Sequence, residues 1–128
     1  MSLYEHEHRI YRQPCPKLVE LMESGDFHNP QKVDDALFEY LTPYQDCNIH
    51  SIVLGCTHFV FFKKRIQELC GNHVEVIDGN MGTARQVKHL LKEKGLLCEE
   101  NQFEVQFLNS SDEEASLQLS HELFQHFR

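Results

Sequence analysis

The stretch from Ile49 to Leu54 constrains the fold of this chain more than any other feature. It is short and largely apolar, and it ends at Gly55, after which apolar residues recur at helical spacing. A run of this kind is typical of a strand buried in a parallel sheet. Parallel strands need a crossover between them, usually a helix. The chain is therefore expected to alternate strands and helices.

Strand-like and helical runs do alternate along the rest of the sequence. Further short strands are expected over residues 8–13, 74–77 and 103–107. Helices are expected from Pro16 to Gly25, from Pro30 to Pro43, between Gly55 and Gly71, over residues 83–94, and over residues 115–127. This order predicts an α/β fold with a small, largely parallel sheet and flanking helices.

The apolar positions of these helices predict the core. The helix over 83–94 is expected to face inward like the others. The predicted core faces are Leu18, Leu21 and Met22; Val33, Ala36, Leu37, Tyr40 and Leu41; Phe59, Phe62, Ile66 and Leu69; and Ala84, Val87, Leu90 and Leu91.

Composition narrows the classes of partner. The 128 residues carry a net charge of −8, which argues against nucleic acid because phosphate binding needs clustered cations. The one basic cluster, at residues 63–65, is interpreted as a solvated helix face. No apolar run approaches the ~20 residues of a membrane span, and the start does not resemble a signal peptide. A cytoplasmic protein is expected.

The five cysteines do not form the pattern of a disulfide framework or of a zinc site. They are Cys15, Cys47, Cys56, Cys70 and Cys98, an odd number without any Cys-x-x-Cys spacing. They are interpreted as free thiols in a reducing compartment, and no metal site is expected.

Residues 54–59 (Leu-Gly-Cys-Thr-His-Phe) carry the sharpest chemical signal. They place Cys56, Thr57 and His58 where a buried strand ends and a helix begins, which is where ligands bind in open α/β sheets. Free N–H groups at a helix start favour anions, so the site suits a carboxylate substrate and a thiolate. Two other interpretations stay open: Cys56 as a small buried apolar residue, and Cys56 with His58 as a nucleophile pair.

This motif closely resembles the second cysteine motif of the glutamate racemases, within the aspartate/glutamate racemase superfamily. Supporting segments occur in the same order and spacing, and the resemblance runs from about residue 8 onward. These segments are residues 14–23, with Cys15 between two prolines and Glu23 at the end; residues 76–78 followed by 83–87; and residues 103–107 followed by the last helix.

The resemblance implies a two-domain racemase fold and an isomerase that needs no cofactor. One cysteine removes the Cα proton of glutamate, and a second cysteine reprotonates the opposite face, which supplies D-glutamate for peptidoglycan. In that scheme Cys56 is the second cysteine, assisted by His58. Thr57 and His58 contact the substrate, a small acidic amino acid. Glu23 is a supporting catalytic carboxylate, although it could equally be an ordinary exposed residue.

The resemblance also implies a missing part. The first half of the family carries an Asp-Ser motif and a Cys-Asn-Thr motif, and neither occurs here. Cys15 aligns with a separate family cysteine taken to be structural, and Cys47 precedes a strand instead of following one. The chain is therefore expected to be inactive alone, with the N-terminal half of the same enzyme as its partner.

A division of the chain follows from the resemblance. Residues 1–7 are expected to be a disordered or cloning-derived start. Residues 8–79 are expected to belong to the C-terminal racemase domain, and residues 80–128 to pack with the N-terminal domain. Without that domain, Phe103, Phe107 and Phe124 would be exposed and the chain would self-associate.

Two departures from the family pattern leave other functions open. Val60 stands where the family usually has proline, and residues 78–80 (Asp-Gly-Asn) replace Asp-Ser-Gly. The alternatives are a related aspartate or hydantoin racemase, a maleate isomerase, and a non-catalytic module that binds an acidic metabolite.

Overall fold

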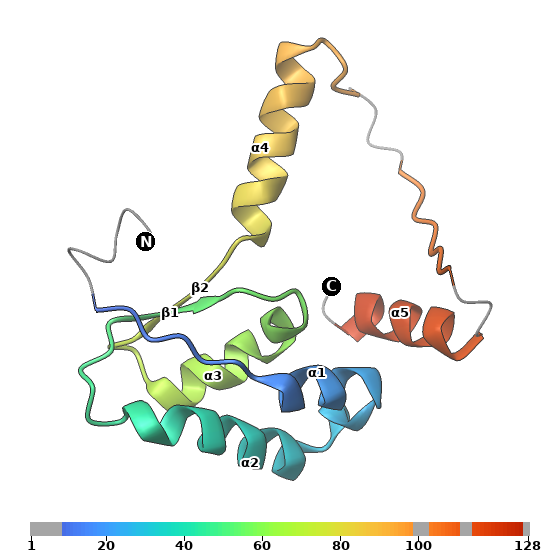
Figure 1. Ribbon diagram of the computed structural model, residues 1–128. Coiled ribbons are helices and arrows are strands. Elements are labelled where there is room, and N and C mark those ends of the chain that lie inside the picture. The colour runs from blue at the N-terminus through green and yellow to red at the C-terminus, as the bar shows by residue number, and fades with distance from the viewer. Residues whose placement is uncertain (1–8, 99–102, 111–113, 127–128) are drawn as a thin grey trace. The chain divides into compact units, whose positions relative to one another are not determined.

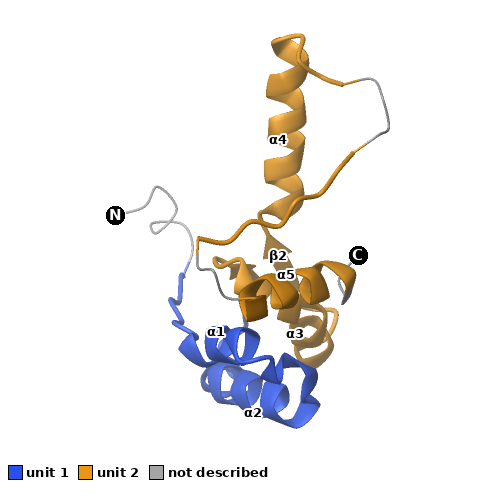
Figure 2. Cartoon of the chain, turned by 90° about the vertical axis from the view of Figure 1, so that its right-hand side faces the viewer, with its two compact units in different colours: residues 1–50 blue, residues 51–128 orange. Residues whose placement is uncertain are grey.

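A computed structural model describes residues 9–98, 103–110 and 114–126 of the chain (Figure 1). The chain forms two compact units, residues 1–50 (unit 1) and residues 51–128 (unit 2) (Figure 2). The expected start at residues 1–7 lies outside the described residues. The expected grouping into residues 8–79 and 80–128 stays a prediction.

Unit 1 is built on two helices. Helix α1 spans Pro16–Glu23 and helix α2 spans Pro30–Leu41. Each begins with proline, whose missing N–H has no helical partner at that position. Single 3₁₀ turns follow each helix, at Asp26–His28 and Thr42–Tyr44. Both helices were predicted, one with Pro16 in its first turn and the other starting after Pro30, one residue later than observed.

The core of unit 1 lies where α1 and α2 contact each other. Met22 and Leu37 are almost fully buried. The backbone N–H of Lys17 donates to the hydroxyl of Tyr40 over 3.1 Å, which satisfies one of the unpaired donors at the start of α1. The buried apolar side chains are Leu18, Met22, Val33, Ala36, Leu37 and Tyr40, all members of the predicted faces.

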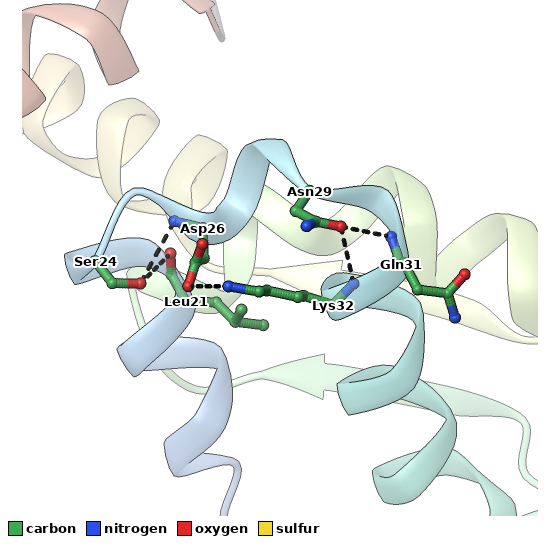
Figure 3. Close-up of polar contacts among 6 residues, drawn as sticks. All are labelled: Leu21, Ser24, Asp26, Asn29, Gln31 and Lys32. Carbon is green, nitrogen blue, oxygen red and sulfur yellow. Dashed lines mark hydrogen bonds and ion pairs between the residues drawn. The ribbon is translucent and has the colours of Figure 1, made fainter.

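The reversal between α1 and α2 is held by short-range polar contacts (Figure 3). Asn29 caps α2, because its side-chain oxygen accepts from the N–H groups of Gln31 (3.1 Å) and Lys32 (3.3 Å). The ammonium of Lys32 lies 2.7 Å from a carboxylate oxygen of Asp26. The hydroxyl of Ser24 accepts from the Asp26 N–H over 3.4 Å. The capped turn fixes where α2 begins.

The prediction of a strand over residues 8–13 is wrong for the described part, since residues 9–13 form no regular secondary structure. This segment is held by side chains instead. The rings of Tyr11 and Tyr44 meet edge-on at 5.3 Å, and the Tyr44 hydroxyl donates to Gln13 over 2.9 Å. A strand needs hydrogen bonds to a neighbouring strand, and the described residues of unit 1 contain no strand with which this segment could pair.

Unit 2 contains the sheet. Strand β1 spans Ser51–Leu54 and strand β2 spans Glu75–Asp78, side by side and parallel (Figure 1). The register runs from Ser51 opposite Glu75 to Leu54 opposite Asp78. The crossover consists of a 3₁₀ helix at His58–Phe62 and helix α3 at Lys63–Cys70. The predicted α/β class with a small parallel sheet and flanking helices is confirmed.

Helix α3 is fastened to β2 by apolar and polar contacts. The side-chain amide of Gln67 donates to the carbonyls of Gly71 and Val74, each over 2.8 Å, and accepts from the Val76 N–H over 3.3 Å. One side chain thus satisfies three backbone groups beside the sheet. Among the described residues of unit 2, the buried apolar ones are Leu54, Phe62, Ile66, Val74 and Val76.

The run from Ile49 to Leu54 is less buried than expected. Leu54 is buried, but the side chain of Val53 is 70% exposed. In the described part of the chain the sheet has only two strands, so β1 lacks the cover that a strand inside a larger sheet would receive.

Helix α4 spans Asn80–Glu93, three residues earlier than predicted, and the prediction that it faces inward is wrong. No residue of α4 is buried, and Val87 and Leu90 remain 51% and 43% exposed. The helical periodicity was correct, but no other described element of unit 2 covers this face. None of the described helices is long and apolar enough to cross a membrane.

The prediction of a strand over residues 103–107 is also wrong, since residues 103–110 form no regular secondary structure. Helix α5, at Glu114–His126, is present as predicted, and Phe127 lies outside the described residues. The ring of Phe107 packs against the rings of His121 and Phe124 on α5, with ring centroids 4.1 Å and 5.5 Å apart. Residues 103–107 pair with neither of the two strands of unit 2, and Phe107 packs against α5.

Candidate functional site

The turn after β1 carries the predicted motif. Strand β1 ends at Leu54, and the backbone carbonyl of Cys56 accepts from the N–H of Phe59 over 3.2 Å, which leads into the 3₁₀ helix. That helix ends at Phe62, which is 3% exposed. A hydrogen-bonded turn at one end and a buried ring at the other therefore position the motif residues.

Cys56 and His58 come together on this turn. The Sγ of Cys56 lies 3.6 Å from Nδ1 of His58, and both side chains are half-buried, whereas Thr57 is exposed. A neutral histidine with an unprotonated Nδ1 accepts the thiol proton, and an imidazolium donates to the thiolate. Two residues apart in sequence, these groups did not have to face each other. Their geometry suits transfer of a proton to or from sulfur.

The end of β2 lies beside the end of β1, because Leu54 and Asp78 are register partners. A carboxylate oxygen of Asp78 lies 2.6 Å from the ammonium of Lys63, and its other oxygen accepts from the N–H of Asn80 over 2.9 Å. The hydrogen bond from Lys63 and then that from Asn80 hold the pKa of Asp78 below its usual value.

This ion pair was not predicted from the sequence, because Lys63 was expected to lie on a solvated helix face. One signal for it was present. Asp78 ends the strand that follows the crossover, so a parallel pairing brings it near the turn after β1 and the start of the next helix.

Glu23 is the last residue of α1, in unit 1, and its side chain is exposed. Cys56, Thr57 and His58 belong to unit 2. The role expected for Glu23 stays a prediction, as do the roles of the three motif residues.

Two other half-buried cysteines, Cys15 and Cys70, have environments that disfavour the thiolate. Burial raises the pKa of Cys15 and of Cys70. Cys15 donates to the carbonyl of Gln13 over 3.4 Å. A thiol with a raised pKa carries less thiolate at neutral pH, which suits the structural role expected for Cys15. None of the five cysteines, all of which the structure describes, forms a disulfide.

The residues that the structure describes contain no group of three or more His, Cys, Asp or Glu side chains able to hold a metal ion. The candidate site itself offers a thiol, an imidazole and a hydroxyl at the edge of a sheet.

Comparison with known proteins gives a consistent result. No family model matches the chain. It is 41% identical to the glutamate racemase of Bifidobacterium animalis subsp. lactis (strain AD011), over 88% of this chain and 43% of that protein. It is 40% identical to the glutamate racemase of Clostridium perfringens (strain 13, type A), over 98% of this chain and 48% of that protein.

Solved structures agree in fold. The crystal structure of glutamate racemase from Thermus thermophilus, in complex with beta-chloro-D-alanine, superposes with a TM-score of 0.72 at 30% identity, over 87% of this chain and 42% of that one. The glutamate racemase isoform RacE1 from Bacillus anthracis gives a TM-score of 0.62 at 24% identity, over 76% of this chain and 37% of that one, which is a likeness of fold.

The chain thus spans somewhat less than half the length of the curated relatives it matches. In sequence along nearly all of its length, and in the fold that carries Cys56 and His58, this chain is similar to the glutamate racemases.

Proposed function

We propose that this chain is the C-terminal half of a glutamate racemase that interconverts L- and D-glutamate by proton transfer between two cysteines. The observation that carries the proposal is the contact between Cys56 and His58 on the turn after β1, 3.6 Å from sulfur to nitrogen. The racemase relatives, matched over up to 98% of the chain, support the choice of reaction.

The chemistry explains why a thiol with an imidazole partner fits this reaction. The Cα proton of an amino acid is weakly acidic, so a base must lie within hydrogen-bond reach of it. His58 stabilises whichever form of Cys56 the half-reaction needs. Thr57, exposed beside them, offers a hydroxyl and a backbone N–H to a substrate carboxylate. No cofactor is needed in this scheme.

One cysteine serves only one face of Cα. The second thiol comes from the N-terminal half, and this chain alone does not racemise glutamate. Glu23 supports the site as a carboxylate once the halves are assembled. In the cell the enzyme acts in the cytoplasm and supplies D-glutamate for peptidoglycan.

The test is incorporation of solvent deuterium at Cα of L- and D-glutamate in D₂O. The samples are this chain, the longest product of its gene, and that product carrying Cys56→Ala or, as a matched control, Cys98→Ala. Cys98 is an exposed cysteine of the same unit. Exchange by the long product and by its Cys98 variant, and loss with Cys56→Ala, is the expected result.

Absence of exchange with either isomer in every sample would overturn the glutamate assignment. Equal exchange by Cys56→Ala and Cys98→Ala would remove Cys56 from the reaction.

A further inference from the structure

The segment that carries the motif begins and ends beside Asp78. At the start of residues 55–62, Leu54 is the register partner of Asp78. Directly after the segment, the ammonium of Lys63 lies 2.6 Å from the Asp78 carboxylate. Eight residues, including Cys56, Thr57 and His58, thereby form a loop whose two ends meet at one residue, at its backbone on one side and at its carboxylate on the other. A closed loop has fewer conformations than one held at a single end.

The surroundings of Asp78 favour this closure. Its side chain is 12% exposed, and its second carboxylate oxygen is occupied by the Asn80 N–H at 2.9 Å. Lys63 is the first residue of α3, and the first turn of that helix contains three cations and no acidic residue. Cations are unfavourable at a helix N-terminus, whereas a carboxylate there is favourable. Asp78 supplies from β2 the charge that α3 lacks.

We propose that Lys63 and Asp78 are positioning residues that hold the turn of residues 55–62 in the geometry where Cys56 meets His58. Their importance for racemisation rests on the proposed function, but their effect on the turn does not. Neither side chain is assigned contact with the substrate.

The experiment compares Lys63→Met and Asp78→Asn with Lys64→Met in this chain. Asp78→Asn keeps an oxygen for the Asn80 N–H and removes the charge, while Lys64→Met makes the same substitution as Lys63→Met one position along, at an exposed site. One readout is hydrogen exchange of the Phe59 amide, which donates across the turn to the Cys56 carbonyl. The other is the pH profile of Cys56 alkylation by iodoacetamide, followed by peptide mass spectrometry with exposed Cys98 as internal reference.

Both Lys63→Met and Asp78→Asn are expected to speed hydrogen exchange of the Phe59 amide. They are also expected to raise the rate of Cys56 alkylation at its high-pH plateau. Each increase should be about 3- to 10-fold, as expected for the loss of one ion pair. Lys64→Met and Lys63→Arg are expected to stay within about 2-fold of wild type, because the first keeps the pair and the second restores its charge.

The two variants separate positioning from a direct charge effect. Removing a cation disfavours a nearby thiolate and removing an anion favours it, so direct electrostatics moves the midpoint of the alkylation profile in opposite directions. Loss of positioning moves Phe59 exchange and the plateau in the same direction. Unchanged exchange in both variants, or equal effects from Lys64→Met, would overturn the proposal.

A variant that unfolds is recognised by uniformly fast exchange across β1 and β2. In that case the double variant Lys63→Arg with Asp78→Glu, which keeps both charges, is used instead. Retained protection of Phe59 in that double variant supports the proposal, and loss of protection in the folded double variant overturns it. None of these readouts uses racemase activity, so their failure is distinct from failure of the glutamate assignment.

Discussion

The Sγ of Cys56 and the Nδ1 of His58 lie 3.6 Å apart on the turn that follows β1. In the proposed reaction this contact decides how readily sulfur gives up and regains a proton. Replacing His58 with asparagine in the long gene product is expected to slow Cα exchange of glutamate by about 10²-fold. Deuterium incorporation followed by NMR measures it.

His89 provides the matched control. It is an exposed histidine of α4 whose ring lies 3.4 Å from Glu93, so His89→Asn removes the same side chain away from the turn. The rate of that variant should stay close to wild type. Equal losses in the two variants would show that the effect is not specific to His58.

Leu37 is the most informative position for the stability of unit 1. It is 2% exposed, whereas its neighbour Phe38 is 49% exposed. Leu37→Ala is expected to lower the free energy of unfolding by about 2–5 kcal/mol, because it leaves a cavity between helices. Phe38→Ala is expected to cost less than about 1 kcal/mol. Urea denaturation followed by circular dichroism separates them, and similar costs would contradict this account of the core.

Gln67 tests the attachment of α3 to β2. Replacing it with leucine keeps much of the volume but leaves the Val76 N–H and the Val74 carbonyl without the amide. A loss of about 1–3 kcal/mol in the free energy of unfolding is expected. Gln31→Leu, which removes an exposed amide bonded to Asp35, serves as control and should change stability by less than about 0.5 kcal/mol. A smaller loss for Gln67→Leu than for the control would rule out this role.

The sequence allowed prediction of elements whose signals are local. Pro16 marked a helix start because its ring suits the first turn, and the next helix was expected directly after Pro30. The apolar positions at Leu18, Met22 and Leu37 gave the core of unit 1. The parallel pairing of β1 and β2 followed from a helical crossover between two short apolar runs.

The errors occurred where structure depends on a partner distant in sequence. Residues 9–13 and 103–107 have strand-like patterns, but a strand forms only with a neighbour, and aromatic contacts to Tyr44 and α5 replace pairing there. At the candidate site, spacing placed Cys56 and His58 at a strand end but could not show that their side chains face each other. The Lys63–Asp78 pair joins residues 15 positions apart, and its partners become apparent only with the strand register.

The ion pair at Asp78 predicts a pH dependence. Because its pKa is lowered in the folded chain, the stabilisation by Lys63 is fully present above the ordinary pKa of 3.8 and is lost as the pH falls through the lowered value. The difference in unfolding free energy between wild type and Asp78→Asn should therefore be constant from about pH 8 to pH 5 and shrink below about pH 4. Urea midpoints across this range measure it. A difference that grew on acidification would contradict the assigned direction.

The exposed apolar surface of unit 2 predicts association of this chain with itself. Phe103 is 73% exposed, and α4 exposes Val87 and Leu90 without cover from the described residues. Contiguous exposed apolar groups favour contact with another apolar surface. Light scattering should show an apparent mass that rises with protein concentration. Val87→Glu with Leu90→Glu is expected to lower that mass toward the monomer, while Lys88→Glu, an exposed charge reversal on the same helix, should not. A monodisperse monomer at every concentration would show that these side chains do not drive association. Addition of the proposed N-terminal half would then test directly whether it covers α4.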